Sequence, residues 1–272
     1  MRCRGVMSSM VFVVGTACSL GAPPAATTLA PTATAAATAA IDDLARQALA
    51  AADAAPDDAG LAVAAAQQLF AAADLRLQRA TVAWLAAHPE ATRAEVLAAD
   101  DRIDDDVRRE IASLCQRGLE LADHAAANGH GEVAVRLQQA QHVSLLAWAN
   151  GATRSLLRGY GPKLVKAIDA AVALDQAFDG AAPLRLSGRF RARAPWPYGD
   201  HAAAARSLRT AVELAPLPIN HLFHGDLLAA TGDAAGAELQ WRAVLTARAD
   251  ASTQWSAEEL RELARRRLAA AH

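Results

Sequence analysis

Residues 231–247, TGDAAGAELQWRAVLTA, place a Gly-Asp pair directly before a run of helix-forming residues. A related stretch begins 33 residues earlier, where Gly199 and Asp200 precede HAAAARSLRTAVELAP, residues 201–216. Glycine adopts the left-handed conformation that ends a helix, and a following aspartate accepts hydrogen bonds from the free N–H groups of the next helix. The recurrence therefore predicts successive helices joined by short turns.

The spacing and the small residues match a tetratricopeptide repeat, a helix–turn–helix of ~34 residues whose two helices cross at small side chains. The better copy spans residues 219–248, and the weaker copy, 199–216, matches over its second helix only. Trp241 is expected to fill the layer between repeats. The residues assigned to this pattern are Gly199, Asp200 and Ala204 in the first copy, and Gly225, Gly232, Asp233, Ala237 and Trp241 in the second.

The composition extends this reading to the rest of the chain. Hydrophobic residues make up 53% of the 272 residues but aromatic residues only 4%, so the core must consist mainly of alanine, leucine and valine. Alanine is the strongest helix former, and the β-branched residues never cluster in the alternating runs that mark strands. We therefore expect an all-α protein, with residues 41–272 forming one domain of stacked helical hairpins as degenerate tetratricopeptide-like repeats.

The first residues have a different character. Arg2 and Arg4 precede an apolar stretch, Val6 to Ala17, as in a secretory signal, and GTAC at residues 15–18 resembles a bacterial lipoprotein box. Residues 1–18 are thus interpreted as a leader, with either lipidation at Cys18 or cleavage elsewhere. Residues 19–40, rich in alanine, threonine and proline, are expected to form a flexible tether. Export to the periplasm as a membrane-anchored lipoprotein follows as a prediction.

Charge and cysteine content exclude some classes of function. The net charge of −2 provides no overall field for nucleic acid, so any membrane association is expected to come from the lipid anchor alone. Outside the leader Cys115 is the single cysteine, which rules out an internal disulfide in the mature body. Its apolar neighbours favour a buried, inert thiol over a nucleophile.

The stretch from Trp148 to about Ala247 resembles the T-component of TRAP transporters. The residues that carry the resemblance are the helix end VALD, a Gly-Arg-Phe element beginning at Gly188, a proline-bearing loop, and the Gly-Asp helix pair. This resemblance implies a periplasm-facing lipoprotein, often a homotrimer, that associates with a solute-binding protein and assists the uptake of organic acids or other apolar ligands. A structural envelope lipoprotein without a transport role is the alternative.

Catalytic and metal-binding patterns are weak. His124, His130 and Glu132 lie around a glycine loop, but their spacing fits no standard zinc site. His221 and His224 are three residues apart on the first helix of the last repeat, where partly buried packing histidines are expected. The sequence lacks a phosphate loop, a dinucleotide fingerprint and a serine nucleophile elbow. A binding or scaffolding protein without cofactor or metal is therefore favoured over an enzyme.

One cluster remains as a candidate recognition loop, at residues 185–198. Its members are Arg185, Arg189, Arg191, Arg193, Trp196 and Tyr198. Arginines beside aromatic rings can hold a carboxylate through paired hydrogen bonds while the rings cover its apolar part. This interpretation requires solvent-facing arginines. The alternative is a structural loop in which Trp196 plugs the groove between repeats, and that packing role is the one we expect for Trp196.

Overall fold

The computed structural model describes residues 31–248 and 257–270, and within these ranges every regular element is a helix. The all-α prediction is confirmed. The helices are α1 (Pro31–Ala54), α2 (Ala59–Ala87), α3 (Arg93–Leu97), the 3₁₀ helix η1 (Ala99–Arg102), α4 (Asp105–Ala127), α5 (Val133–Leu157), α6 (Tyr160–Leu174), α7 (Phe178–Arg193), α8 (His201–Leu214), α9 (Pro218–Ala230), α10 (Ala234–Thr246) and α11 (Ala257–Ala269). The predicted leader, Cys18 and residues 19–30 lie outside the described ranges.

Side-chain caps fix where several helices begin. Asp58 accepts a hydrogen bond from the Leu61 N–H at 3.0 Å at the start of α2. At α3, Thr92 and Glu95 form a capping box, in which each side chain accepts a hydrogen bond from the other residue's backbone N–H. Because these groups satisfy N–H donors that the helix itself leaves free, the turns between helices are short and well defined.

Helix α1 begins earlier than expected. It starts at Pro31, so residues 31–40 of the predicted flexible tether are helical. The physical reason is local: proline is favoured in the first turn of a helix, and the alanines that follow have the highest helix propensity. The tether prediction is therefore wrong over residues 31–40.

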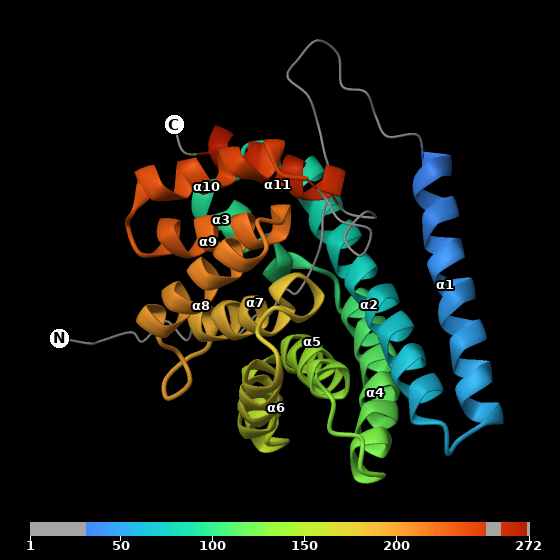
Figure 1. The fold of residues 1–272 in the computed structure, drawn as a ribbon. Helices are drawn as coiled ribbons and strands as arrows, with labels where there is room; N and C mark the ends of the chain where they lie inside the picture. The colour runs from blue at the N-terminus through green and yellow to red at the C-terminus, as the bar shows by residue number, and fades with distance from the viewer. Residues whose placement is uncertain (1–30, 249–256, 271–272) are drawn as a thin grey trace.

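The helices pack largely as sequence neighbours, in hairpins stacked along the chain (Figure 1). One core joins α2, α4, α5, α6 and α7 and includes Leu77, Trp148 and Phe190. A second core, formed mainly by α8, α9, α10 and α11, contains Leu208 and Trp241. Helix α11 returns to contact α3, so the last helix closes against an early part of the chain.

Cys115 lies in the first core and is completely buried. Burial raises the pKa of its thiol well above the ordinary value, which keeps the group protonated and unreactive. Among the described helices, none combines the length and the hydropathy needed to cross a membrane.

Candidate functional site

The hairpin of α9 and α10 is built around the crossing of Gly225 and Ala237. A Cβ atom at Gly225 would lie 2.7 Å from the Trp241 ring and 3.2 Å from the Ala237 carbonyl oxygen, so only glycine allows this approach. Gly232 has φ +91°, and Asp233 accepts a hydrogen bond from the Gly236 N–H at 2.8 Å. The turn is therefore left-handed and is followed at once by a capped helix.

The hairpin of α7 and α8 has the same crossing. A Cβ atom at Gly188 would overlap the Leu208 side chain and lie 3.2 Å from the Ala204 carbonyl oxygen. Asp200 caps α8 by accepting from the Ala203 N–H at 2.9 Å. Comparison of the two copies at a fixed offset of 33 residues did not identify Gly188 as the glycine of this crossing. The second helices are offset by 33 residues, but the first helices are offset by 37.

The difference of four residues is an insertion in the connector between α7 and α8. Residues 194–200 join these helices, whereas residues 231–233 suffice between α9 and α10. The connector is anchored at both ends. The Tyr198 ring packs directly on Gly161, where an added Cβ atom would lie only 2.7 Å from the ring. The centroids of the Tyr198 and Phe190 rings are 6.0 Å apart. Gly199 lies so close to the Ala194 carbonyl that a side chain would overlap it.

Trp196 projects from this anchored connector. Its side chain is 90% exposed, so the expectation that it plugs the groove between repeats is wrong. The groove is already filled, because Leu208 and Trp241 occupy the crossings of the two hairpins and both are completely buried. The insertion carries Trp196 away from those positions.

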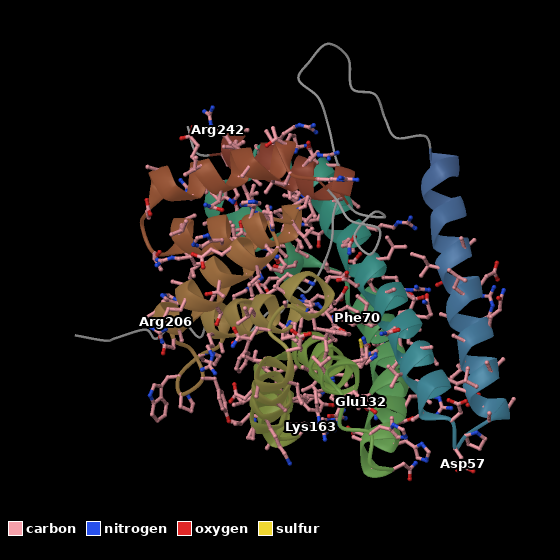
Figure 2. The ribbon with its side chains drawn as sticks, viewed as in Figure 1. Asp57, Phe70, Glu132, Lys163, Arg206 and Arg242 are labelled. Carbon is pink, nitrogen blue, oxygen red and sulfur yellow. The ribbon has the colours of Figure 1, made fainter. Side chains whose placement is uncertain are left out.

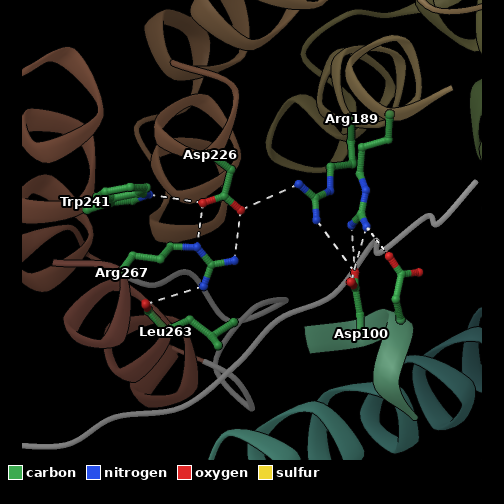
Figure 3. A network of polar contacts seen from close by, with 8 residues as sticks. Asp100, Arg189, Asp226, Trp241, Leu263 and Arg267 are labelled. Atoms are coloured by element: carbon green, nitrogen blue, oxygen red, sulfur yellow. Dashed lines mark hydrogen bonds and ion pairs between the residues drawn. The ribbon is translucent and has the colours of Figure 1, made fainter. Parts of the chain in front are cut away.

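The predicted solvent-facing arginines are mostly buried in α7, where the sequence pattern suggested a loop. Arg193 donates to both carboxylate oxygens of Asp100, at 2.7 and 3.2 Å. The Arg189 guanidinium lies 3.8 Å from Asp100 and 3.5 Å from Asp226 (Figure 3). Arg191 is the partial exception, with 28% of its side chain exposed and an ion pair to Asp169 at 3.2 Å.

Asp226 of α9 is the second carboxylate, after Asp100, that pairs with buried arginines. It accepts hydrogen bonds from Arg267 of α11 at 2.5 and 2.9 Å and from the Trp241 indole N–H at 3.1 Å. We call Asp100, Arg189, Arg193, Asp226 and Arg267 the interhelix charge network. It joins η1, α7, α9 and α11, so it fixes elements that are far apart in the sequence (Figure 3).

In the interhelix charge network, burial and ion pairing shift the pKa of a charged group in opposite directions. Burial by itself raises the pKa of Asp100, but the ion pairs with Arg193 and Arg189 outweigh it and the pKa is lowered. Burial lowers the pKa of Arg189 to about 10, which still leaves it charged at neutral pH. Burial and the charge of Asp100 raise the pKa of Asp101 to about 6. The small cavity beside Arg189, about 30 Å³, has room for a water molecule and not for an organic acid.

Arg185 has a structural partner as well. Its guanidinium donates to the Gly180 carbonyl and to Asn220 Oδ1, both at 3.1 Å. The Asn220 amide also donates to the Gly180 carbonyl, at 3.1 Å. Asp179, Gly180 and Ala181 all have positive φ, so these contacts hold a left-handed turn at the start of α7.

A second surface feature surrounds the first turn of α6. Leu156 and Leu157, 75% and 81% exposed, end α5 just before this turn, and the Tyr198 ring of the connector covers Gly161 within it. Lys163 and Lys166 follow on α6 and line a groove of about 280 Å³ with residues of α5. This groove and the connector lie on opposite faces of α6, because Gly161 and Lys163, two residues apart on a helix, point in nearly opposite directions. We call Leu156, Leu157 and Trp196 the α6 edge.

The candidate histidines make local contacts. His130 Nδ1 lies 3.2 Å from Glu132 Oε1, and His124 contacts Asn128. His224 is buried, and His221 Nδ1 lies 2.8 Å from Gln240 Oε1. Over the part of the chain that the structure describes, no group of three or more potential metal-ligating side chains occurs.

Comparison with known proteins adds little to this geometry. No family model and no curated protein matches the sequence. Among solved structures, a thermophilic TPR protein of Thermus thermophilus is similar, with a TM-score of 0.46 and 16% sequence identity over 85% of this chain and 98% of that chain.

Proposed function

We propose that this protein is a non-catalytic interaction protein that binds a partner protein at the α6 edge. The observation that carries the proposal is Trp196, 90% exposed on a connector that Tyr198 anchors to α6 and α7. Tryptophan is the residue type most enriched among the side chains that dominate binding energy at protein interfaces. Because the connector is already ordered, binding through it loses little conformational entropy.

The contacts of the buried ionisable groups support a non-catalytic role. The arginines of the interhelix charge network already face carboxylates of the same chain, and the cavity beside them has space for about one water molecule. A catalytic site needs reactive groups that converge on a space large enough for a substrate. The network therefore supports a structural role for these charges.

The resemblance of residues 148–247 to TRAP T-components refines the proposal. Under this refinement the protein is an exported lipoprotein, lipidated at Cys18 and facing the periplasm. Its partner is a solute-binding protein or a small organic acid. A homotrimer belongs to the same proposal. The alternative is a structural or scaffolding lipoprotein of the envelope with no transport role.

Affinity capture from an envelope extract tests the proposal. The bait is the full chain, and the variant Trp196→Ala is compared with Leu239→Ala, because Leu239 is also an exposed large apolar residue (67%) but lies on α10. We expect a specific partner to be retained by the wild type and by Leu239→Ala and lost with Trp196→Ala. Equal retention by both variants would contradict binding at the α6 edge.

The identity of the captured protein decides between the two refinements. A periplasmic solute-binding protein supports the TRAP-accessory role, and a structural envelope protein supports the alternative. Replacing Cys18 by Ala tests the anchor separately: release of the protein from the membrane fraction supports lipidation, and unchanged fractionation contradicts it.

A further inference from the structure

We infer that the turn between α4 and α5 is a site of spontaneous covalent modification, where the side chain of Asn128 deamidates to aspartate and isoaspartate. The inference goes beyond the proposed function and does not depend on it, because this turn contributes no residue to the α6 edge.

The reaction needs the asparagine, the residue after it and water. The backbone nitrogen of Gly129 attacks the side-chain carbonyl carbon of Asn128, a C–N bond forms, and the amide nitrogen leaves as ammonia with the proton of the Gly129 N–H. Water then opens the cyclic imide. Opening at the side-chain carbonyl gives aspartate, and opening at the backbone carbonyl gives isoaspartate, in which the chain runs through the side chain. No oxidant or reductant takes part.

The sequence contains the tripeptide Ala-Asn-Gly twice, at residues 127–129 and at residues 149–151. Glycine after asparagine favours the attack, because no Cβ atom hinders the approach of the side chain to the backbone nitrogen. By sequence alone the two asparagines are therefore equally reactive. The structure places them in different surroundings.

Asn128 lies in an exposed turn. Both Asn128 and Gly129 are exposed, and a Cβ atom added to Gly129 would meet nothing within 4 Å. The Gly129 N–H donates to the Ala126 carbonyl over 3.3 Å, a long hydrogen bond at the end of a helix. Figure 2 shows Glu132, which follows this turn, in the lower part of the molecule. Fraying of the last turn of α4 is enough to free the attacking nitrogen.

The way α4 ends explains why a reactive pair is found here. Gly129 has φ +91°, and this left-handed residue lets the His130 N–H donate to the Ala125 carbonyl at 3.1 Å. That bond closes the C-terminus of α4, and glycine is the residue that adopts such a φ without strain. The same glycine that ends the helix therefore leaves the Asn128 side chain open to attack.

Asn150 is held by the helix around it. Its side chain is half-buried on α5, and its amide donates to the Leu146 carbonyl, one turn back, at 2.8 Å. This bond directs the side chain toward the start of the helix and away from the Gly151 nitrogen. The Gly151 carbonyl also accepts from the Ser155 hydroxyl at 2.7 Å, and Leu146 belongs to the first core. Attack at Asn150 therefore requires the helix to open within that core.

Deamidation changes the end of α4 in two ways. The new carboxylate lies at the C-terminus of a helix, where the helix dipole disfavours negative charge. It also lies beside the exposed His124, whose ring nitrogen is 3.1 Å from the Asn128 amide. Isoaspartate adds a methylene group to the backbone, which disrupts the bond between His130 and Ala125. We therefore expect residues 125–130 to exchange their amide protons faster after modification.

Peptide mapping by mass spectrometry tests the inference on the full chain, aged in mildly alkaline buffer. The same protein aged in concentrated urea is the control, because unfolding leaves two identical tripeptides. We expect Asn128 to deamidate roughly tenfold or more faster than Asn150 in the folded protein, and the two rates to agree within about twofold in urea. If the two rates differ no more in the folded protein than in urea, the inference is overturned.

A variant with a longer side chain confirms the position. Asn128→Gln keeps the amide but would have to form a larger ring, so it should remove modification from this turn and leave Asn150 unchanged. Isoaspartate is then measured with a protein isoaspartyl carboxyl methyltransferase and labelled S-adenosylmethionine as the probe. Aged wild-type protein should take up the label and aged Asn128→Gln should take up little. Equal labelling of the two proteins would contradict modification at Asn128.

Discussion

The hairpins α7–α8 and α9–α10 share one crossing but differ in what surrounds it. Gly188 faces Ala204 in the first, and Gly225 faces Ala237 in the second, and a Cβ atom at either glycine would lie 3.2 Å from the opposing carbonyl oxygen. The residue after each glycine is charged, Arg189 in the first helix and Asp226 in the other, and these two face each other at 3.5 Å. Equivalent positions of successive repeats therefore pair across their interface.

The connectors show where the repeat tolerates change. The three residues between α9 and α10 make a minimal turn, whereas the seven between α7 and α8 include an insertion that exposes Trp196. The crossing constrains backbone atoms that touch, so both hairpins keep it, while a surface connector can lengthen at little cost. An insertion of this kind adds a binding element without disturbing the stack.

The largest expected effect on stability comes from removing Asp226, the carboxylate that α9 contributes to the interhelix charge network. Asp226→Ala removes the carboxylate that faces Arg267 at 2.5 Å and Arg189 at 3.5 Å, and both arginines are buried. Removing one partner from a buried ion pair leaves an uncompensated charge, so we expect a loss of about 3–5 kcal/mol in the free energy of unfolding. Urea denaturation followed by circular dichroism measures it.

Glu238→Ala is the matched control for that substitution. Glu238 lies on α10 and pairs with Arg242 one helical turn away, at a site where the Arg242 side chain is 66% exposed. Such a surface pair contributes only about 0.3–0.5 kcal/mol. Equal losses from the two substitutions would show that the interhelix charge network has no special structural role.

The next effect is a dependence of stability on pH, to which His142 and Asp101 contribute with opposite sign. His142 of α5 is buried against Ala66 of α2 and Gly118 of α4, and burial lowers its pKa to about 4. The unfolded chain takes up this proton near pH 6.5 and the native state does not, so stability falls by up to about 3 kcal/mol as pH drops from 6.5 to 4. Asp101, beside the interhelix charge network and with its pKa raised to about 6, acts in the opposite direction over the same range.

Single variants separate these two contributions. Asp101→Asn removes the opposing carboxyl, so the free energy of unfolding should fall more steeply below pH 6.5 than in the wild type. His142→Gln keeps a donor for the Ala66 carbonyl, which His142 Nε2 contacts at 3.0 Å, and should flatten the profile. Urea denaturation between pH 4 and 7 gives the slopes, and unchanged slopes in both variants would contradict the assignment.

A smaller effect tests the shared crossing. Gly225→Ala places a methyl group against the indole of Trp241, which a hydrogen bond to Asp226 holds in position. Gly188→Ala places one against Leu208, whose side chain can change rotamer. We expect losses of about 1–3 kcal/mol for both, with the larger loss at Gly225. Thermal denaturation ranks them, and a larger loss at Gly188 would show that the indole adapts more easily than the leucine.

Short-range sequence signals predicted the helical fold and both hairpin turns. Asp200 and Asp233 act on N–H groups three residues away, so a single chain segment contains the whole capping signal. The packing of Trp241 was predictable for a similar reason, because Gly225 and Ala237 lie within the same repeat. The role of Gly188 in the first crossing was not predicted, because the four-residue insertion shifts it out of register with Gly225.

The arginines were misplaced because their partners are distant in the sequence. Arg193 and Asp100 are 93 residues apart, and Arg267 and Asp226 are 41 residues apart. Alone, RLSGRFRAR indicates an exposed basic segment, and only the packing of η1, α9 and α11 around α7 supplies the carboxylates that permit burial. The exposure of Trp196 depended in the same way on the groove being filled by other residues.

The smallest expected effect on stability is at Trp196, where the sequence alone predicted a large one. A tryptophan packed in a repeat groove would cost roughly 3–5 kcal/mol on replacement by alanine. At 90% exposure it buries almost no apolar surface, so Trp196→Ala should change the free energy of unfolding by less than about 0.5 kcal/mol. Tyr198→Ala supplies the contrast, since its ring packs on Gly161 and Phe190, and should lower stability by about 1 kcal/mol or more. Urea denaturation of both variants decides the point: if Trp196→Ala proves as costly as Tyr198→Ala, the connector folds Trp196 onto the protein in solution and cannot present it to a partner.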